Sequence, residues 1–156
     1  MFKKRKMIQS LHKQLAEVLV DKNLSVEYQI NILLVISERY IFAGCTHKAI
    51  EVLKKILEIL KSNKIDTRAV WGEMFLSLGQ CYALQKSREL AIESLIEAEK
   101  CFEEAYVMDS AFGEEYIVVL FDLFQIYDEL DEDKRATACR NKMLLIEERE
   151  EYEEED

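Results

Sequence analysis

Tyrosine and alanine recur in phase along the chain, and this pattern constrains the fold more than any other feature. Three tyrosines, at steps of 42 and 45 residues, each stand nine positions before an alanine: Tyr40 and Ala49, Tyr82 and Ala91, Tyr127 and Ala136. Apolar residues stand four and seven positions before each tyrosine, which is the spacing of one helix face. A bulky ring late in one helix facing a methyl early in the next lets antiparallel helices approach closely. The pattern therefore predicts three helix hairpins in succession.

The composition favours long helices. The 156 residues include no proline and only four glycines, and 49% of them are hydrophobic. A chain so poor in turn residues is a poor candidate for a β-sandwich or barrel, and so apolar a chain is a poor candidate for disorder. At this length one domain with a substantial core is the natural expectation.

Apolar residues recur every three or four positions and predict about seven helices, with no strand. We expect a single domain over residues 1–149, with a capping helix at 4–22 and three hairpins at about 26–61, 68–106 and 114–149. Ser25 and Ser87 stand where helix N-caps are expected. The acidic run 150–156 lacks an apolar stripe, and we expect it to fray because its charges repel each other.

The middle hairpin resembles a tetratricopeptide repeat. Leu78-Gly79-Gln80-Cys81-Tyr82 is followed by Ala91, Leu95 and Ala98, in the order and spacing of that family's motif. The outer hairpins have Ser37 and Phe124 in place of the glycine, and the period exceeds the usual one, as in long-helix variants of the family. The resemblance implies an all-α fold, a right-handed superhelical stack of antiparallel helix hairpins.

The resemblance also implies that the first helix of each hairpin lines a concave groove. Amides there would hold a peptide backbone, apolar side chains would bury its apolar groups, and acids would pair with its Lys or Arg. The alternative is that these are ordinary exposed helix positions or pack on a neighbouring helix. The candidate groove residues are Asn31, Leu34, Glu38, Ile41, Glu73, Leu76, Gln80, Phe121, Asp122 and Gln125.

The charge distribution bears on the kind of partner. The formal net charge is −10, and residues 147–156 alone carry eight acids against one Arg. An acidic body repels phosphate backbones, so we expect no nucleic acid and favour a basic or amphipathic protein segment as partner. The sequence also leaves open whether the protein forms a homodimer. No apolar run is long enough for a membrane span, and we expect a cytoplasmic protein, although Lys3, Lys4, Arg5 and Lys6 also suit a nuclear address.

Residues that carry catalysis or bind metal are not apparent. The chain lacks a nucleophile elbow, a glycine-rich phosphate loop and zinc-protease or EF-hand patterns. Its four cysteines form no close pair, and the only histidines are His12 and His47, so we expect no metal site. We therefore predict a protein that is not an enzyme, has no cofactor, and carries buried, reduced thiols.

The leading hypothesis is a non-catalytic interaction module, an adaptor or a chaperone-like protein, that binds a partner segment in its groove. Two alternatives stay open: a structural subunit that docks into a larger assembly, and an acidic chaperone of a histone or ribosomal protein. The acidic tails of heat-shock chaperones, which some tetratricopeptide domains bind with a basic clamp, are an unsuitable cargo. Here the equivalent faces carry Glu38, Glu73 and Asp122, which repel a carboxylate.

Overall fold

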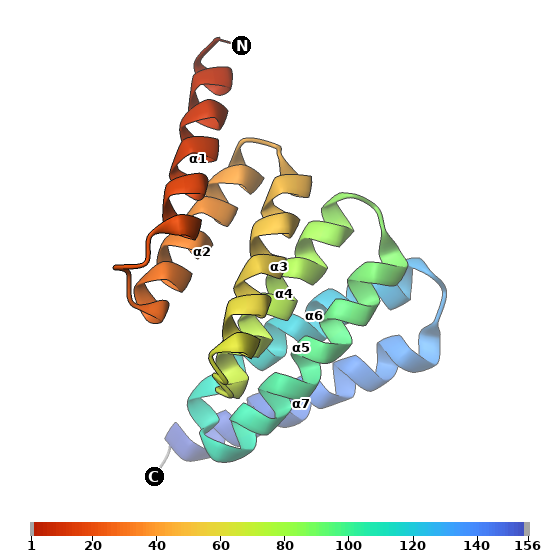
Figure 1. The fold of residues 1–156 in the computed structure, drawn as a ribbon. Coiled ribbons are helices and arrows are strands. Elements are labelled where there is room, and N and C mark those ends of the chain that lie inside the picture. The colour runs from red at the N-terminus through yellow and green to blue at the C-terminus, as the bar shows by residue number, and fades with distance from the viewer. Residues whose placement is uncertain (1, 155–156) are drawn as a thin grey trace. The chain divides into compact units, whose positions relative to one another are not determined.

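The structure is a computed structural model that describes residues 2–154, and this part of the chain is helical throughout, with short connections (Figure 1). Within residues 2–154 the predicted all-α class and the seven helices are confirmed. The chain divides into two compact units, Met1–Asp66 and Thr67–Asp156, which are described separately below. The elements are α1 (Phe2–Val20), α2 (Val26–Phe42), α3 (Thr46–Ser62), α4 (Arg68–Leu84), α5 (Arg88–Met108), the 3₁₀ turn η1 (Ser110–Phe112), α6 (Gly113–Glu129) and α7 (Asp133–Glu154).

Most helix ends lie within two residues of the predicted ones, and the exception is α7. This helix continues to Glu154 rather than ending near residue 149, since glutamate is a good helix former even where no apolar stripe remains. Of the predicted frayed run, residues 155–156 lie outside the described residues. The Ser25 hydroxyl accepts a hydrogen bond from the Tyr28 amide, as an N-cap should, whereas the Ser87 side chain makes no such bond.

In the N-terminal unit, α2 and α3 form a hairpin and α1 packs along α2 (Figure 1). The Tyr40 ring is fully buried, and its hydroxyl lies 2.7 Å from Nδ1 of His12 on α1. Gln29 donates a second bond, of 3.1 Å, to the Val18 carbonyl near the end of α1. Because a buried hydroxyl without a partner is costly, the bond to His12 ties α1 to the hairpin.

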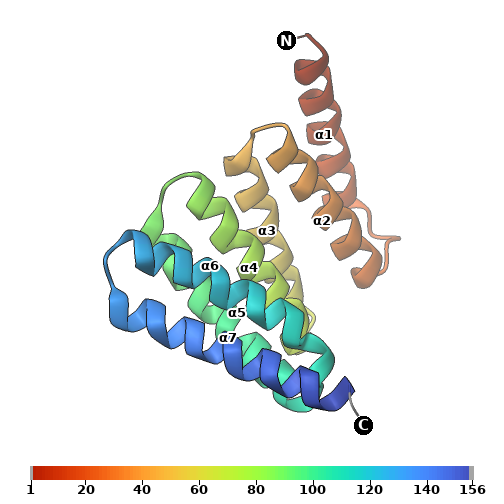
Figure 2. The same cartoon turned by 180° about the vertical axis from the view of Figure 1, so that it is seen from behind.

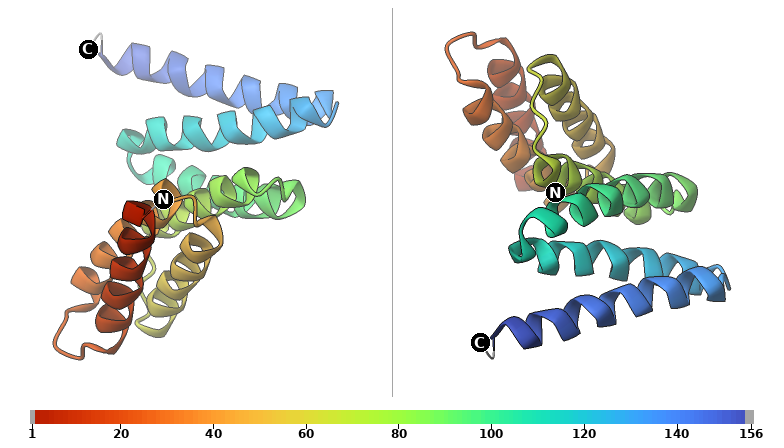
Figure 3. Two further views of the ribbon diagram at one scale, coloured as in Figure 1. Left: turned by 90° about the horizontal axis from the view of Figure 1, so that it is seen from above. Right: turned by 90° about the horizontal axis from the view of Figure 1, so that it is seen from below.

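In the C-terminal unit, the hairpins α4–α5 and α6–α7 lie side by side, with α5 packed on α6 (Figures 2 and 3). One hydrophobic cluster draws side chains from all four helices. It contains Ala91 and Leu95 of α5, Leu120 of α6 and Ala136 of α7, and Tyr82 of α4 packs against it. The tyrosines and alanines of both hairpins therefore belong to a common core.

The three hairpins close with the same backbone hydrogen bonds. The carbonyl of each repeated tyrosine accepts a bond from the amide five residues on: Cys45 to Tyr40 (2.8 Å), Ser87 to Tyr82 (2.9 Å) and Glu132 to Tyr127 (2.8 Å). The residue just before that amide has positive φ in each turn, at Gly44, Lys86 and Asp131. This is the Schellman ending of a helix. The repeat read from the sequence is thus also a repeat of turn geometry.

Gly79 allows α4 and α5 to approach closely. A Cβ atom at this position would lie 2.6 Å from Cγ and 2.8 Å from Cδ2 of Leu95, a fully buried side chain. Such distances are far below van der Waals contact, so a larger residue would push the two helices apart. The glycine of the Leu-Gly-x-x-Tyr motif is therefore explained by packing.

We predict that Gly79→Ala lowers the free energy of unfolding by about 1–2 kcal/mol, because overpacking outweighs the better helix propensity of alanine. In a Leu95→Ala background the two closest atoms are gone and the Ala91 carbonyl oxygen, 3.3 Å away, remains, so the same change should cost much less or stabilise the protein by up to ~1 kcal/mol. Urea unfolding of the four proteins of this cycle measures both effects. Equal effects of Gly79→Ala in the two backgrounds would show that Leu95 is not the obstacle.

We further predict that Lys86→Gly stabilises the protein by about 0.5–1 kcal/mol, because Lys86 has a φ of 59° that glycine adopts without strain. The matched control is Gln85→Gly, one residue earlier, where φ is −82°. Glycine has no conformational advantage there, so this control should be neutral or destabilising. Thermal or urea unfolding at pH 7 separates the two variants, and loss of stability in Lys86→Gly would contradict the account of the turn.

Candidate functional site

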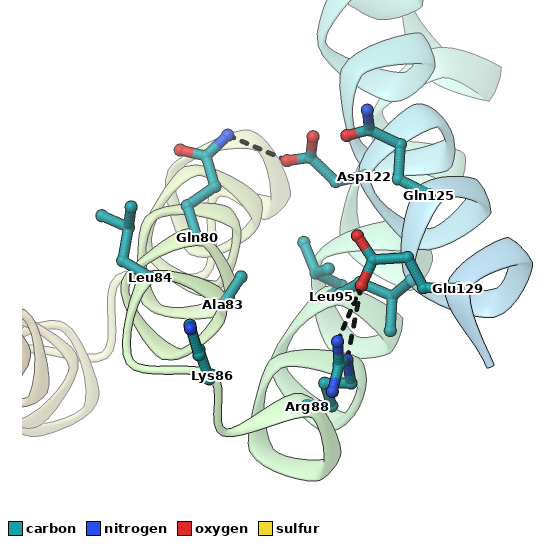
Figure 4. Close-up of a pocket in the computed structure, with 11 residues that line it drawn as sticks. Gln80, Ala83, Leu84, Lys86, Arg88, Leu95, Asp122, Gln125 and Glu129 are labelled. Carbon is teal, nitrogen blue, oxygen red and sulfur yellow. Dashed lines mark hydrogen bonds and ion pairs between the residues drawn. The ribbon is translucent and has the colours of Figure 1, made fainter.

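A groove of about 700 Å³ opens between α4 and α6 in the C-terminal unit (Figure 4). The α4 wall carries Gln80 and the α6 wall carries Asp122, while Leu95 of α5 lies between them at the base. Gly79 lets α5 lie close under α4. The Leu95 side chain of α5 therefore forms an apolar base for the groove. The lining residues are Gly79, Gln80, Ala83, Leu84, Lys86, Arg88, Leu95, Asp122, Gln125, Ile126 and Glu129.

A hydrogen bond crosses the groove between the two hairpins. Nε2 of Gln80 donates to Oδ2 of Asp122 over 2.9 Å (Figure 4). Burial raises the pKa of the Asp122 carboxyl, and the bond from Gln80 lowers it by less, so the net direction is upward. The carboxylate is half-buried, and among the described residues its hydrogen bonding is met by a neutral amide. It is therefore poorly compensated in the free protein.

The other end of the groove is basic. Arg88, at the start of α5, makes a 3.1 Å ion pair with Glu129 of α6, and Lys86 stands in the turn before it (Figure 4). These three residues are not among the groove residues predicted from the sequence. A usable signal was present, because Arg88 and Glu129 are 41 residues apart and Gln80 and Asp122 are 42 apart. Complementary side chains about one repeat apart come together across neighbouring hairpins.

The structure brings together three of the six candidates in the C-terminal unit: Gln80, Asp122 and Gln125 line the groove. Leu76 is half-buried and packs against the hydrophobic cluster instead of lining the groove. Phe121 directly precedes Asp122 on α6, and 47% of its surface is exposed. Glu73 is exposed on α4, outside the set of lining residues.

The other four candidates belong to the N-terminal unit. Asn31, Leu34, Glu38 and Ile41 all lie on α2. Asn31 and Glu38 are exposed, while Leu34 and Ile41 are half-buried. Their part in a groove that runs over all three hairpins stays a prediction of the superhelical arrangement.

The arrangement offers binding groups rather than reactive ones. Among the described residues no group of three or more His, Cys, Asp or Glu side chains is placed to hold a metal ion. The four cysteines are free thiols, and burial raises the pKa of Cys81 to about 11, which keeps it protonated and unreactive. No helix within residues 2–154 is long and apolar enough to cross a membrane.

Comparisons with known proteins identify no family for this chain. No protein-family model matches it, and a search of curated proteins finds no relative.

We predict that Asp122→Asn stabilises the folded protein at pH 7. Burial raises the folded-state pKa of Asp122 above the unfolded-state pKa of about 4. The contribution of Asp122 to stability is therefore most favourable below the unfolded-state pKa, and it is lost as the pH rises through the folded-state pKa. Removing the charge should remove this loss, while the amide oxygen can still accept the bond from Gln80. Urea unfolding at a series of pH values from 3.5 to 7 measures the difference.

The control for this experiment is Asp128→Asn, which removes the same charge from an exposed position on the same helix. Its effect on stability should be small, because the position is exposed. A pH-independent or destabilising effect of Asp122→Asn would contradict the desolvation of the carboxylate.

Proposed function

We propose that the protein is a non-catalytic interaction module that binds a basic or amphipathic segment of a partner protein in the groove between α4 and α6. The observation that carries the proposal is Asp122, a half-buried carboxylate on the groove wall whose pKa is raised by burial. A Lys or Arg side chain from a partner would compensate this charge where Gln80 does so only in part.

The remaining lining suits an extended or helical segment. Leu84 and Ile126 are apolar members of the lining, and Leu84 keeps 63% of its surface exposed, whereas Ile126 is buried. Gln80 and Gln125 stand two positions before the repeated tyrosines and carry amides that can bond a peptide backbone. Polar groups that fix orientation around an apolar base are typical of a binding groove.

The charge of the C-terminal unit supports a basic partner. Residues 67–156 contain nine Lys/Arg and 24 Asp/Glu, a formal charge of −15. A field of this sign raises the local concentration of cationic segments and speeds their association. We expect binding to weaken at high salt for the same reason.

The test is a titration of fluorescein-labelled 12-residue peptides, one alternating Lys and Leu pairs and one with Glu in place of Lys. The Lys peptide should bind, and Asp122→Lys should weaken that binding about tenfold or more, because it puts like charges face to face. Asp128→Lys is the matched control, with the same charge change on the same helix outside the groove lining. Equal losses in the two variants would remove the groove from the proposal.

A docking subunit of a larger assembly is a second candidate, favoured by an apolar surface at the end of α5. Val107 and Met108 are 76% and 87% exposed, and Val107, Met108 and Phe112 border a depression of about 710 Å³. Affinity purification with Met108→Glu and Asp122→Lys variants distinguishes the two readings. Loss of the native partner in Met108→Glu alone would favour docking through this surface.

A further inference from the structure

Helix α7 is apolar on two opposite faces, and only one of them is used within the structure. Ala136, Cys139 and Ile146 are buried in the core of the C-terminal unit. The opposite face carries Leu145, with 66% of its surface exposed, and Tyr152, with 74% exposed. Figures 2 and 3 show α7 as the outermost helix of this unit, with α6 on its inner side. No described element covers the outer face.

The outer apolar residues follow a seven-residue spacing that is symmetric about Leu145. Ala138 stands seven positions before Leu145, and Tyr152 seven positions after it. This is the spacing of one of the two seam positions of a coiled-coil heptad, and the companion positions, three and four residues further on, are polar or charged. An antiparallel copy of the helix centred on Leu145 would place each Tyr152 over the small Ala138 of the other copy, and Leu145 against its own equivalent.

The charges of α7 are divided between its two halves. Residues 133–142 carry four Lys/Arg and one Asp, whereas residues 147–154 carry six Glu and one Arg. A parallel pair would place each half against a half of the same sign. An antiparallel pair places the basic half of one copy along the acidic half of the other, and also opposes the two helix dipoles.

We propose that the outer face of α7 binds the same face of a second copy, antiparallel, with a two-fold axis at Leu145. The resulting contact is isologous, so every interaction occurs twice. The interface is small, with two copies of Ala138, Leu145 and Tyr152 at its centre, and it belongs to the weak, reversible class. This interface lies on the side of the unit away from α5, whereas the groove lies between α4 and α6 with α5 at its base. The proposed dimer therefore does not depend on the proposed function of the groove.

Sedimentation equilibrium between about 10 μM and 1 mM tests the association, and we expect a monomer–dimer equilibrium in this range. Leu145→Glu should raise the dissociation constant by at least ~10-fold, since two apolar contacts are lost and two carboxylates are brought together. Circular dichroism checks that the variant is folded, as expected for a residue with 66% exposure. A wild-type protein that stays monomeric, or a dimer that Leu145→Glu leaves intact, would overturn the proposal.

Two matched double variants test whether the charges along α7 pair across the interface. Glu148→Lys with Glu151→Lys should weaken the dimer by at least ~10-fold, because it removes negative charge from the half of α7 that lies along the basic half of the other copy. Glu89→Lys with Glu93→Lys makes the same change in net charge on exposed positions of α5 and should leave the dimer at least as strong. Equal weakening by both pairs would refute charge pairing along α7.

Cysteine cross-linking tests the direction, in a Cys45→Ser background because the other three cysteines are buried. Leu145→Cys should link to its own copy under mild oxidation, since it lies on the axis. Ala138→Cys alone should not, whereas a mixture of Ala138→Cys and Tyr152→Cys proteins should form the mixed dimer. Efficient linking of Ala138→Cys to itself would indicate a parallel pair and overturn the antiparallel arrangement.

Discussion

The bond from the tyrosine carbonyl to the amide five residues on, with a left-handed residue between them, is the constraint on which the rest depends. In the middle hairpin this turn ends α4 at Leu84 and starts α5 at Arg88. It thereby sets the register that brings Leu95 onto Gly79. Because these two positions touch, α5 lies under the groove as an apolar base, and Arg88 reaches Glu129 at its end. Local backbone geometry therefore determines the shape of the groove.

The groove holds a charge that folding alone does not favour. Asp122 loses hydration on folding and gains only a bond from a neutral amide, so its ionised form opposes stability at neutral pH. The ion pair between Arg88 and Glu129, in contrast, compensates both of its members. The proposed binding of a cationic segment would offset this cost, because it would add the charge compensation that Gln80 supplies only in part.

Much of this arrangement could be predicted from the sequence, for reasons that differ between elements. Helical periodicity identified seven helices because each buries one stripe, and the phased Tyr and Ala identified the hairpins. Periodicity identifies an apolar face without saying which neighbour covers it, so Leu76, expected in the groove, packs on the core instead. The sequence did not indicate that Lys86 closes the turn after α4, because a lysine with positive φ has no sequence signature. Glycine, which stands at the equivalent position 44, does have one.

The cross-hairpin pairs connect these points. Gln80 with Asp122, Arg88 with Glu129, and Lys142 with Glu99 are separated by 42, 41 and 43 residues, close to one repeat. When hairpins of equal length pack side by side, positions one period apart become neighbours, and selection for polar contacts then acts on pairs at that separation. The outer face of α7 meets the same physical requirement without a described neighbour. In the dimer proposed above, a second copy would supply that neighbour, because the basic and acidic halves of α7 complement those of an inverted copy.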